Sequence, residues 1–291
     1  MKTSKSNLAN ERAVLITGCS SGIGRATAVY LAQQGSATVF ATVRKESDRD
    51  ALAGLGLVNL VPICPLDLSK PDQIQAVFEK ISHELAQRGI QGLYAIINNA
   101  GGGFIAPVEL MDLKEFNLEL QARITGPLAL LQAFLPLIRQ ARGRLLWIVS
   151  PGLIASPYIA SLDACFFAIN YLARVLNIEL KQWKIPSIMI RCGGILTSAP
   201  ARTDQQLELA FKNWPSDRLA LYDKSLRQQQ IEFAKFDKQR TPPEQVAKVV
   251  SHALDAARPK QRYQVGYMSG AASFLEALPQ PVADWLIASR G

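Results

Sequence analysis

The chain has 291 residues, of which 48% are apolar and 19% charged, and its formal net charge is +8 at pH 7. This composition is that of a folded chain and excludes a disordered one. Its four cysteines have no CxxC spacing and it holds only two histidines, so we expect no metal site and a reducing compartment. No apolar run approaches the ~20 residues that cross a bilayer, and no hydrophobic leader begins the chain. We therefore expect a cytoplasmic protein with no integral membrane segment.

The positive net charge is compatible with an anionic ligand or a membrane surface. Lys and Arg are scattered along the chain, however, and no basic helix carries interleaved aromatic residues. This pattern argues against nucleic acid as a partner. We expect the charge to reflect a solvated surface together with a site for phosphate groups.

Short apolar or β-branched runs alternate with longer amphipathic stretches, the pattern of βαβ units on a parallel sheet. The predicted strands are Ala13–Thr17, Thr38–Thr42, Leu60–Pro62, Leu93–Ile97, Arg144–Val149, Ser187–Arg191 and Arg262–Val265. The predicted helices include Gly22–Gln34, Pro71–Gln87 with Ser69 as its N-cap, and one long helix within residues 116–141. These elements predict a single α/β domain over residues 1–291, a doubly wound parallel sheet with helices on both faces.

Residues 203–239 are charged, rich in Gln and interrupt this alternation. We predict a helical insertion at about residues 200–240 that covers a substrate pocket. A helix pair that is only solvated is an equally open interpretation.

The stretch "VLITGCSSGIGRATA" places Gly18, Gly22 and Gly24 between a predicted strand and a predicted helix. Glycines permit a tight turn and the close approach of a pyrophosphate, and the helix N-terminus offers free N–H groups to that anion. A glycine turn that only packs strand on helix is the weaker interpretation. We therefore predict a Rossmann dinucleotide site whose turn also includes Ser20, Ser21 and Ile23.

The spacing TGxxxGxG resembles that of the short-chain dehydrogenase/reductase superfamily. The similarity continues at "LDL" (66–68), "NNAG" (98–101) and "RCGGILT" (191–197), and the C-terminal stretch resembles the branch that handles retinoids and hydroxysteroids. In this family an acidic residue contacts the adenine and a Thr hydroxyl meets the nicotinamide amide. The resemblance thus implies that the cofactor is also bound by Asp67, Leu68, Asn99, Ala100, Gly101 and Thr197.

The end of the second predicted strand bears on the choice of cofactor. A carboxylate there would accept a hydrogen bond from the ribose 2′-OH, whereas a base accommodates a 2′-phosphate. This chain has Arg44 and Lys45 at that point. The pattern favours NADP(H) over NAD(H), with a plain surface role for Arg44 as the alternative.

The resemblance also implies a catalytic tetrad, from which this chain departs. Family members that transfer hydride use a Tyr as acid, a Lys one helical turn later, a Ser and an Asn. In a gapless register the Asn, Tyr and Lys positions hold Arg123, Leu162 and Phe166. The Ser position holds Val149, with Ser150 adjacent as a possible substitute.

A second register begins from "YIAS" and puts Tyr158 in the Tyr position. It requires extra residues before "LNIEL" and shortens the segment after Ser150. Leu162 then stands where the Lys belongs, so the Lys is absent in both registers. We prefer the gapless register, in which Tyr158 lines the pocket.

The altered site gains an arginine and a carboxylate, Arg123 and Asp163. A guanidinium can polarise a carbonyl or hold a carboxylate, and a carboxylate in an apolar pocket can act as a base. A structural ion pair between the two residues is equally open. Adjacent helix positions do not share a face, so Asp163 need not point where Leu162 points.

Three functions are compatible with these residues. The first is an NADP(H)-binding protein that carries out non-redox chemistry (cyclisation, isomerisation or elimination) on a hydrophobic small molecule in secondary metabolism. The intact dinucleotide motifs and the replaced redox residues favour this function. The second is a slow NADPH-dependent carbonyl reductase or alcohol dehydrogenase with Tyr158 or water as acid. The third is a non-catalytic NADP-binding sensor or partner subunit.

The apolar helix around "CFFAINYLARVL" also bears on assembly. Leu172, Leu176 and Leu180 lie at helical spacing, and relatives in the family pair through this helix. We expect a homodimer or homotetramer unless this stripe belongs to the core.

Overall fold

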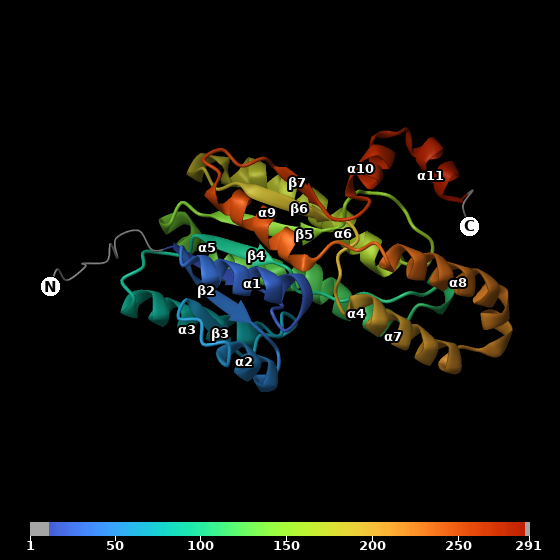
Figure 1. The fold of residues 1–291 in the computed structure, drawn as a ribbon, viewed down its shortest axis with the longest axis horizontal. Helices are drawn as coiled ribbons and strands as arrows, with labels where there is room; N and C mark the ends of the chain where they lie inside the picture. The colour runs from blue at the N-terminus through green and yellow to red at the C-terminus, as the bar shows by residue number, and fades with distance from the viewer. Residues whose placement is uncertain (1–11, 289–291) are drawn as a thin grey trace.

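The computed structural model describes residues 12–288, in which seven parallel strands form one sheet in the order β3-β2-β1-β4-β5-β6-β7 (Figure 1). The register places Ile16 beside Ala41 on one side and Ile97 on the other. β2 and β6 are buried at every position, as expected of strands covered on both faces. The strands are β1 (Arg12–Ile16), β2 (Ala37–Thr42), β3 (Leu60–Ile63), β4 (Ala95–Asn98), β5 (Arg144–Val149), β6 (Ser187–Cys192) and β7 (Arg262–Val265). The predicted doubly wound parallel sheet is confirmed.

Helices cover both faces of this sheet and create two apolar cores. One core joins the sheet to α1, α2 and α9, and the other joins it to α3, α5 and α6. The α-helices are α1 (Gly22–Gln34), α2 (Glu46–Ala53), α3 (Pro71–Gln87), α4 (Leu113–Leu120), α5 (Gly126–Gln140), α6 (Ala160–Glu179), α7 (Ala199–Asn213), α8 (Ser216–Asp237), α9 (Pro243–Asp255), α10 (Ser269–Ala277) and α11 (Gln280–Ala288). Short 3-10 helices occupy Val108–Leu110 and Leu180–Trp183.

Two helices differ from their prediction. The long helix expected within residues 116–141 is interrupted by a π-helical turn at Gln121–Thr125, which separates α4 from α5. Helix α3 has Lys70 rather than Ser69 as its N-cap, because the Ser69 hydroxyl donates to the Asp67 carboxylate instead. π-turns of this kind are frequent at functional sites.

The strand order reverses between β1 and β4, so the crevice at the carboxyl ends of these two strands is where the fold places a ligand. α7 and α8 occupy the predicted insertion and extend beyond this edge of the sheet (Figure 1). Their role as a substrate lid stays a prediction.

The apolar stripe of α6 faces inward in part. Leu176 and Leu180 belong to the core beneath the sheet, so these two positions do not form an intermolecular surface. The outward face instead shows Phe167, Tyr171 and Ile178, which are 44%, 68% and 76% exposed. The expected homodimer or homotetramer stays a prediction.

Candidate functional site

The glycine turn between β1 and α1 requires the residues that the sequence places there. Gly18 has φ +73, and a Cβ built on it would lie 2.9 Å from the Ala100 Cα. A Cβ on Gly24 would lie 2.3 Å from the Gly18 carbonyl oxygen and 2.4 Å from the Asn99 Nδ2. The Ser21 side chain at the N-cap makes no capping hydrogen bond. The first N–H groups of α1 are thus without a side-chain cap at the point where a pyrophosphate would bind.

A network of hydrogen bonds fixes this turn against the end of β4. The Thr17 Oγ1 accepts from the backbone N–H groups of Asn99 at 3.0 Å and of Ala100 at 3.1 Å. The Asn99 Nδ2 donates to the carbonyl oxygens of Thr17 at 3.0 Å and Gly18 at 3.1 Å. These contacts bring Asn99, Ala100 and the adjoining Gly101 beside the glycine turn, and their role in cofactor binding stays a prediction. Thr17 is a site-building residue that the sequence analysis missed, although it directly precedes Gly18 in the motif.

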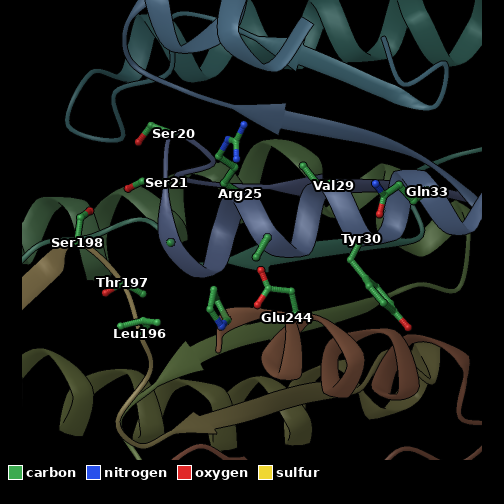
Figure 2. Close-up of a pocket in the computed structure, with 13 residues that line it drawn as sticks. Ser20, Ser21, Arg25, Val29, Tyr30, Gln33, Leu196, Thr197, Ser198 and Glu244 are labelled. Atoms are coloured by element: carbon green, nitrogen blue, oxygen red, sulfur yellow. The ribbon is translucent and has the colours of Figure 1, made fainter. Parts of the chain in front are cut away.

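A cavity of about 550 Å³ opens beside the glycine turn. Figure 2 shows that Ser20 and Ser21 of the turn approach Thr197 and Ser198 from the segment after β6, while Arg25 projects from α1. A Cβ on Gly22 would lie 3.2 Å from the Thr197 Cγ2, which shows how closely the two segments meet. Hydroxyl groups, an arginine and a helix N-terminus are the groups that bind phosphate oxygens.

The same cavity continues along α1 past Val29, Tyr30 and Gln33 to Glu244 at the start of α9 (Figure 2). Of the predicted cofactor residues, only Ser20, Ser21, Gly22 and Thr197 line this cavity. The side chain of Ile23 instead packs against the core under α1. Ser198 and Glu244 were not anticipated from the sequence. The hydroxyl end is therefore suited to an anion, and the Glu244 end is not.

The Asp67 carboxylate is held at the other end of the predicted dinucleotide site. Its Oδ1 accepts from the Ser69 backbone N–H at 3.0 Å and from the Ser69 hydroxyl at 2.8 Å. Partial burial opposes ionisation, but these hydrogen bonds and the positive charges of Arg44 and Lys70 outweigh it and lower the pKa of Asp67. Leu68, its neighbour, is buried in the core. The carboxylate is thus fixed and charged at neutral pH.

Arg44 and Lys45 follow β2 and are both exposed. Within residues 12–288 neither side chain forms an ion pair or a hydrogen bond. Both cations are therefore available to an anionic group at the end of β2.

Arg123 lies in the π-turn and is held from three directions. Its Nε forms an ion pair with the Glu119 carboxylate at 3.1 Å, and its Nη2 donates to the Gly102 carbonyl oxygen. Its Cζ lies 4.8 Å above the ring of Phe166. The side chain is 10% exposed. The guanidinium is thus neutralised by a carboxylate one helical turn earlier rather than by Asp163.

The glycines after "NNA" allow this close packing. Gly101 and Gly103 have φ +148 and +144, a region that favours glycine. A Cβ on Gly101 would lie 2.5 Å from the Arg123 Cζ, and a Cβ on Gly103 would lie 2.5 Å from the Leu162 Cδ2. Leu162 and Arg123 therefore both contact one glycine loop, with Phe166 against Arg123.

Asp163 points away from Arg123. Its Oδ2 accepts from the Ser156 backbone N–H at 2.9 Å, which ties the start of α6 to the preceding loop. Burial raises the pKa of the Asp163 carboxyl to about 6, against the opposite effect of that hydrogen bond. The ion pair between Arg123 and Asp163, one of the two interpretations of these residues, is therefore wrong.

Tyr158 connects the loop before α6 to α8. Its hydroxyl donates to the Ser225 Oγ at 2.9 Å, and its ring packs edge-on against Tyr222 with centroids 6.3 Å apart. The ring also packs against an apolar cluster around Ile105, Leu207 and Leu226. Within residues 12–288 no hydrogen bond joins Tyr158 to a Lys. Tyr158 thus lies in the contact between α8 and the body of the protein.

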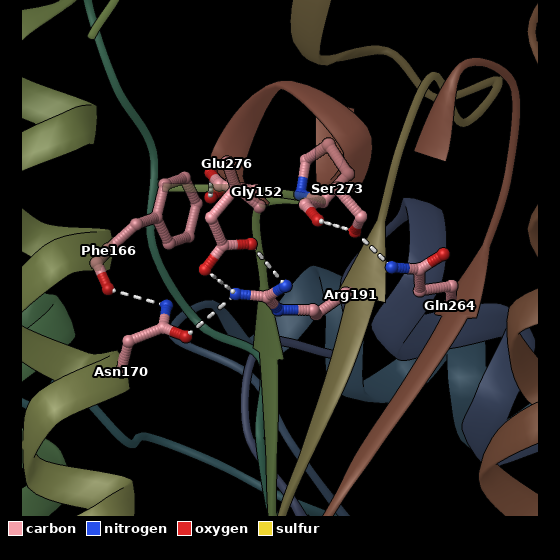
Figure 3. Close-up of polar contacts among 9 residues, drawn as sticks. Gly152, Phe166, Asn170, Arg191, Gln264, Ser273 and Glu276 are labelled. Carbon is pink, nitrogen blue, oxygen red and sulfur yellow. Dashed lines mark hydrogen bonds and ion pairs between the residues drawn. The ribbon is translucent and has the colours of Figure 1, made fainter. Parts of the chain in front are cut away.

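Ser150 follows β5, and its Oγ donates to the Gly152 carbonyl oxygen at 3.0 Å. Helix α10 holds this loop in place, because the Ser273 hydroxyl donates to the Pro151 carbonyl oxygen at 3.1 Å (Figure 3). A Cβ on Gly152 would lie 2.7 Å from the Ala272 carbonyl oxygen. The Ser150 loop therefore packs tightly against α10.

A buried ion pair fixes α10 to the sheet. Arg191 of β6, which is 2% exposed, binds both carboxylate oxygens of Glu276 at 2.6 and 2.9 Å and contacts the Asn170 Oδ1 at 3.4 Å (Figure 3). Burial opposes ionisation of Glu276, but Arg191 outweighs it and lowers the pKa of this carboxyl. Arg191 opens the "RCGGILT" motif, yet its partner 85 residues later was not anticipated.

Over residues 12–288, no helix has the length and apolarity needed to cross a membrane, and no group of three His, Cys, Asp or Glu side chains could hold a metal ion. The four cysteines are free.

Several known proteins are similar to this chain. Human 11-beta-hydroxysteroid dehydrogenase type 2 is 31% identical over 91% of the chain, and human 17-beta-hydroxysteroid dehydrogenase type 2 is 33% identical over 67% of it. The chain spans 66% and 50% of the length of these two relatives. The 3-amino-tetrahydro-pyrrolizinone reductase of Xenorhabdus hominickii is 31% identical, with 88% of this chain and 87% of that protein covered.

Among solved structures, a short-chain dehydrogenase from Streptomyces avermitilis superposes with a TM-score of 0.72 at 21% identity over 99% of both chains. A short chain dehydrogenase from Burkholderia cenocepacia in complex with NADP superposes with a TM-score of 0.71 at 19% identity, over 96% of this chain and 98% of that one. These two likenesses establish the fold. Residues 12–208 match the family model described as short chain dehydrogenase. The chain therefore belongs to the short-chain dehydrogenase family, among relatives that include hydroxysteroid dehydrogenases.

Proposed function

We propose that this protein binds NADP(H) and uses the adjoining site for non-redox chemistry on a hydrophobic small molecule. The observation that supports this most strongly is the composition of the wall opposite the glycine loop. There Leu162 contacts Gly103, and Phe166 lies under Arg123. Neither side chain can donate a proton. The dinucleotide half of the site, by contrast, keeps its glycine turn and hydroxyl groups.

The preference for NADP(H) rests on the charge at the end of β2. Arg44 and Lys45 are exposed and make no ion pair within the described residues, so they are available to a 2′-phosphate. One oxygen of the Asp67 carboxylate already accepts two hydrogen bonds from Ser69, and the carboxylate lies in the field of Arg44. Ser20, Ser21 and Thr197 would hold the phosphates and the nicotinamide end of a bound NADP(H), whose hydride is not transferred in the proposed chemistry.

The proposal of non-redox chemistry rests on how proton donors are arranged. General acid catalysis requires a group within hydrogen-bond reach of the substrate, with a pKa tuned by its neighbours. The Tyr158 hydroxyl is engaged by Ser225 on α8, which disfavours the slow reductase with Tyr158 as acid. Asp163, with its pKa near 6, is the titratable group of this region whose protonation changes near neutrality.

The substrate proposed is apolar because the site's nearest side chains are. Leu162, Phe166 and the apolar cluster under α7 and α8 offer hydrocarbon surface, and the Arg123 Nη1 makes no hydrogen bond within residues 12–288. The free Nη1 amino group suits a carbonyl or carboxylate group on an otherwise apolar molecule.

A second candidate is a non-catalytic NADP-binding protein. The ion pair of Arg123 with Glu119 and the hydrogen bond of Asp163 with Ser156 favour it, since both charged groups of the site already have structural partners. Both candidates predict cofactor binding, and they differ in whether a small molecule is converted.

The test combines binding and turnover. Calorimetry is expected to show one NADPH bound per chain, and NADPH absorbance is expected to stay constant when aldehydes, ketones and ketosteroids are added. Substrate-dependent loss of NADPH in the wild-type protein would overturn the non-redox proposal. The matched variant Arg123→Asn/Leu162→Tyr/Phe166→Lys supplies a phenol and an ammonium and removes the guanidinium that the new ammonium would face. It is expected to bind NADPH equally and to gain slow NADPH consumption.

A further inference from the structure

Three segments at one edge of the sheet concentrate positive charge, and each is called here the loop before its strand. They are residues 139–144, from the end of α5 to the start of β5, residues 180–186, which include the 3-10 helix before β6, and residues 256–262, from the end of α9 to the start of β7. Together they contain eight Lys or Arg and no Asp or Glu, whereas the whole chain has 32 basic and 24 acidic residues. Lys and Arg are scattered along the chain, but the fold brings these eight residues close together.

The strand order makes the three loops neighbours. β5, β6 and β7 are consecutive and parallel, so the loops that precede them lie at the same edge. The Arg139 Cζ lies 5.2 Å from the ring centroid of Trp183, which joins the first loop to the second. Arg144 donates to the Ala256 carbonyl oxygen at 3.2 Å, which joins the first to the third. This edge is opposite the one that bears α7, α8 and the cofactor site (Figure 1).

Seven of these cations are exposed, and one of them, Arg262, lies in the field of Glu276, which leaves six with no acidic partner. They form what we call the basic edge: Arg139, Arg142, Lys181, Lys184, Arg258 and Lys260. Within residues 12–288 none of the six forms an ion pair. Of the acids that border the loops, Asp255 is already paired with Arg12, and Glu179 stands alone. Some basic side chains elsewhere do have acidic partners, since Arg227, Lys235 and Arg240 of the α7–α9 region all bind carboxylates.

Apolar groups accompany the charges. Trp183, within the second loop, is 40% exposed, and Ile178, just before that loop, is 76% exposed. Tryptophan and basic residues together are the composition of surfaces that lie at the boundary between water and lipid head groups. Clusters of four to eight Lys and Arg bind anionic lipids. Each charge raises the partition coefficient of the protein onto the membrane by about five-fold.

Nucleic acid fits this surface less well. Proteins that bind single strands stack bases on open aromatic faces, but the ring of Trp183 is covered by Arg139. Duplex binding by a helix in the major groove is also disfavoured, because the cations come from three loops rather than from one helix.

We propose that the basic edge is a docking surface for an anionic phospholipid bilayer, on which the protein lies peripherally with α7, α8 and the cofactor site facing the water. The inference does not depend on the proposed function, because no residue of the basic edge belongs to the cofactor site. It requires no membrane-spanning segment.

The test is co-sedimentation of the full chain with vesicles. We expect binding to vesicles of phosphatidylcholine and phosphatidylserine at 3:1, no binding to pure phosphatidylcholine, and loss of binding when the salt concentration rises from 0.1 to 0.5 M. Arg142→Glu/Lys184→Glu is expected to weaken partitioning by about 25-fold or more. Lys181→Glu/Arg258→Glu, which changes different loops, should do the same and guards against misfolding of the first variant.

The matched control is Lys212→Glu/Lys224→Glu, which changes the net charge equally but on α7 and α8. It should bind anionic vesicles like the wild type. If the control variant weakens binding as much as the other two variants, only the net charge matters and the docking surface is overturned. The proposal is also overturned if the wild-type protein does not sediment with anionic vesicles. Tighter binding to a DNA duplex than to vesicles, lost in the same variants, would assign the edge to nucleic acid instead. NADPH affinity and melting temperature are measured in parallel for every variant. Unchanged values with lost vesicle binding assign the loss to the basic edge and not to the cofactor site.

Discussion

The ion pair between Arg191 and Glu276 should dominate the stability of the C-terminal segment. Replacing Glu276 with Ala removes both hydrogen bonds of a bidentate pair and leaves a guanidinium that is 2% exposed without its counter-charge. Breaking a buried pair from one side costs about 3–5 kcal/mol. For a chain of this size about 1 kcal/mol corresponds to about 2 °C, so the melting temperature should fall by roughly 6–10 °C.

Differential scanning fluorimetry and urea unfolding measure this change, and exposed pairs supply the control. Lys235 and Glu232 form an ion pair whose side chains are 65% and 51% exposed, so Glu232→Ala should change stability by less than about 1 kcal/mol. Arg191→Met/Glu276→Leu, which removes both charges, should recover most of the loss because no uncompensated ion stays buried. A loss in Glu276→Ala no larger than in Glu232→Ala would refute the reasoning.

The same pair sets a pH dependence with a definite sign. The folded-state pKa of Glu276 is lowered, so its contribution is fully present above the unfolded value of about 4.3 and is lost as pH falls through the folded value. The difference in stability between wild type and Glu276→Gln should therefore shrink in acid. A constant difference from pH 7 to pH 3 would contradict this assignment.

Three further predictions concern the site. Arg44→Ala should weaken NADPH binding by about ten-fold or more, the effect of losing one charge-assisted contact, and leave NADH binding unchanged in calorimetry. Gly24→Ala should abolish binding of either cofactor, because its Cβ would lie 2.3 Å from the Gly18 carbonyl oxygen. Asp163→Asn should stabilise the protein by about 1 kcal/mol at pH 8, after allowance for solvent screening, and by almost nothing at pH 4. This sign follows because a carboxyl whose folded pKa is raised to about 6 destabilises the fold as it ionises; urea melts of both proteins at the two pH values measure it.

The sheet and the glycine turn were predictable because their signals are local. Alternating apolar runs identify strands, and Gly18, Gly22 and Gly24 are needed wherever backbone and helix must approach so closely. The ends of elements were less predictable. The strand expected to begin at Leu93 begins at Ala95, because the backbone N–H of Leu93 donates instead to the Leu137 carbonyl oxygen at the end of α5.

The partners of the site's charged groups could be predicted only where they are near in sequence. Glu119 and Arg123 lie at the i, i+4 spacing of helical ion pairs, a signal that was available in the sequence. The partner of Arg191 lies 85 residues away on another element, and no local pattern relates the two. The basic edge was likewise not predictable from a local pattern, because only the order of β5, β6 and β7 brings its loops together.

The packing around the glycine loop bears on the proposed non-redox function. That proposal takes Arg123, Leu162 and Phe166 as replacements for the redox residues of the family, and replacements acquired independently would have no reason to fit one another. Here Arg123 and Leu162 each lie within 2.5 Å of where a Cβ would stand on Gly101 and Gly103, and Phe166 supports the guanidinium from below. Three side chains and two glycines thus form one set of mutually dependent contacts. A single exchange, such as Phe166→Lys, would place an ammonium beside Arg123 and is expected to destabilise the site, so a variant designed to transfer hydride must change the three positions together.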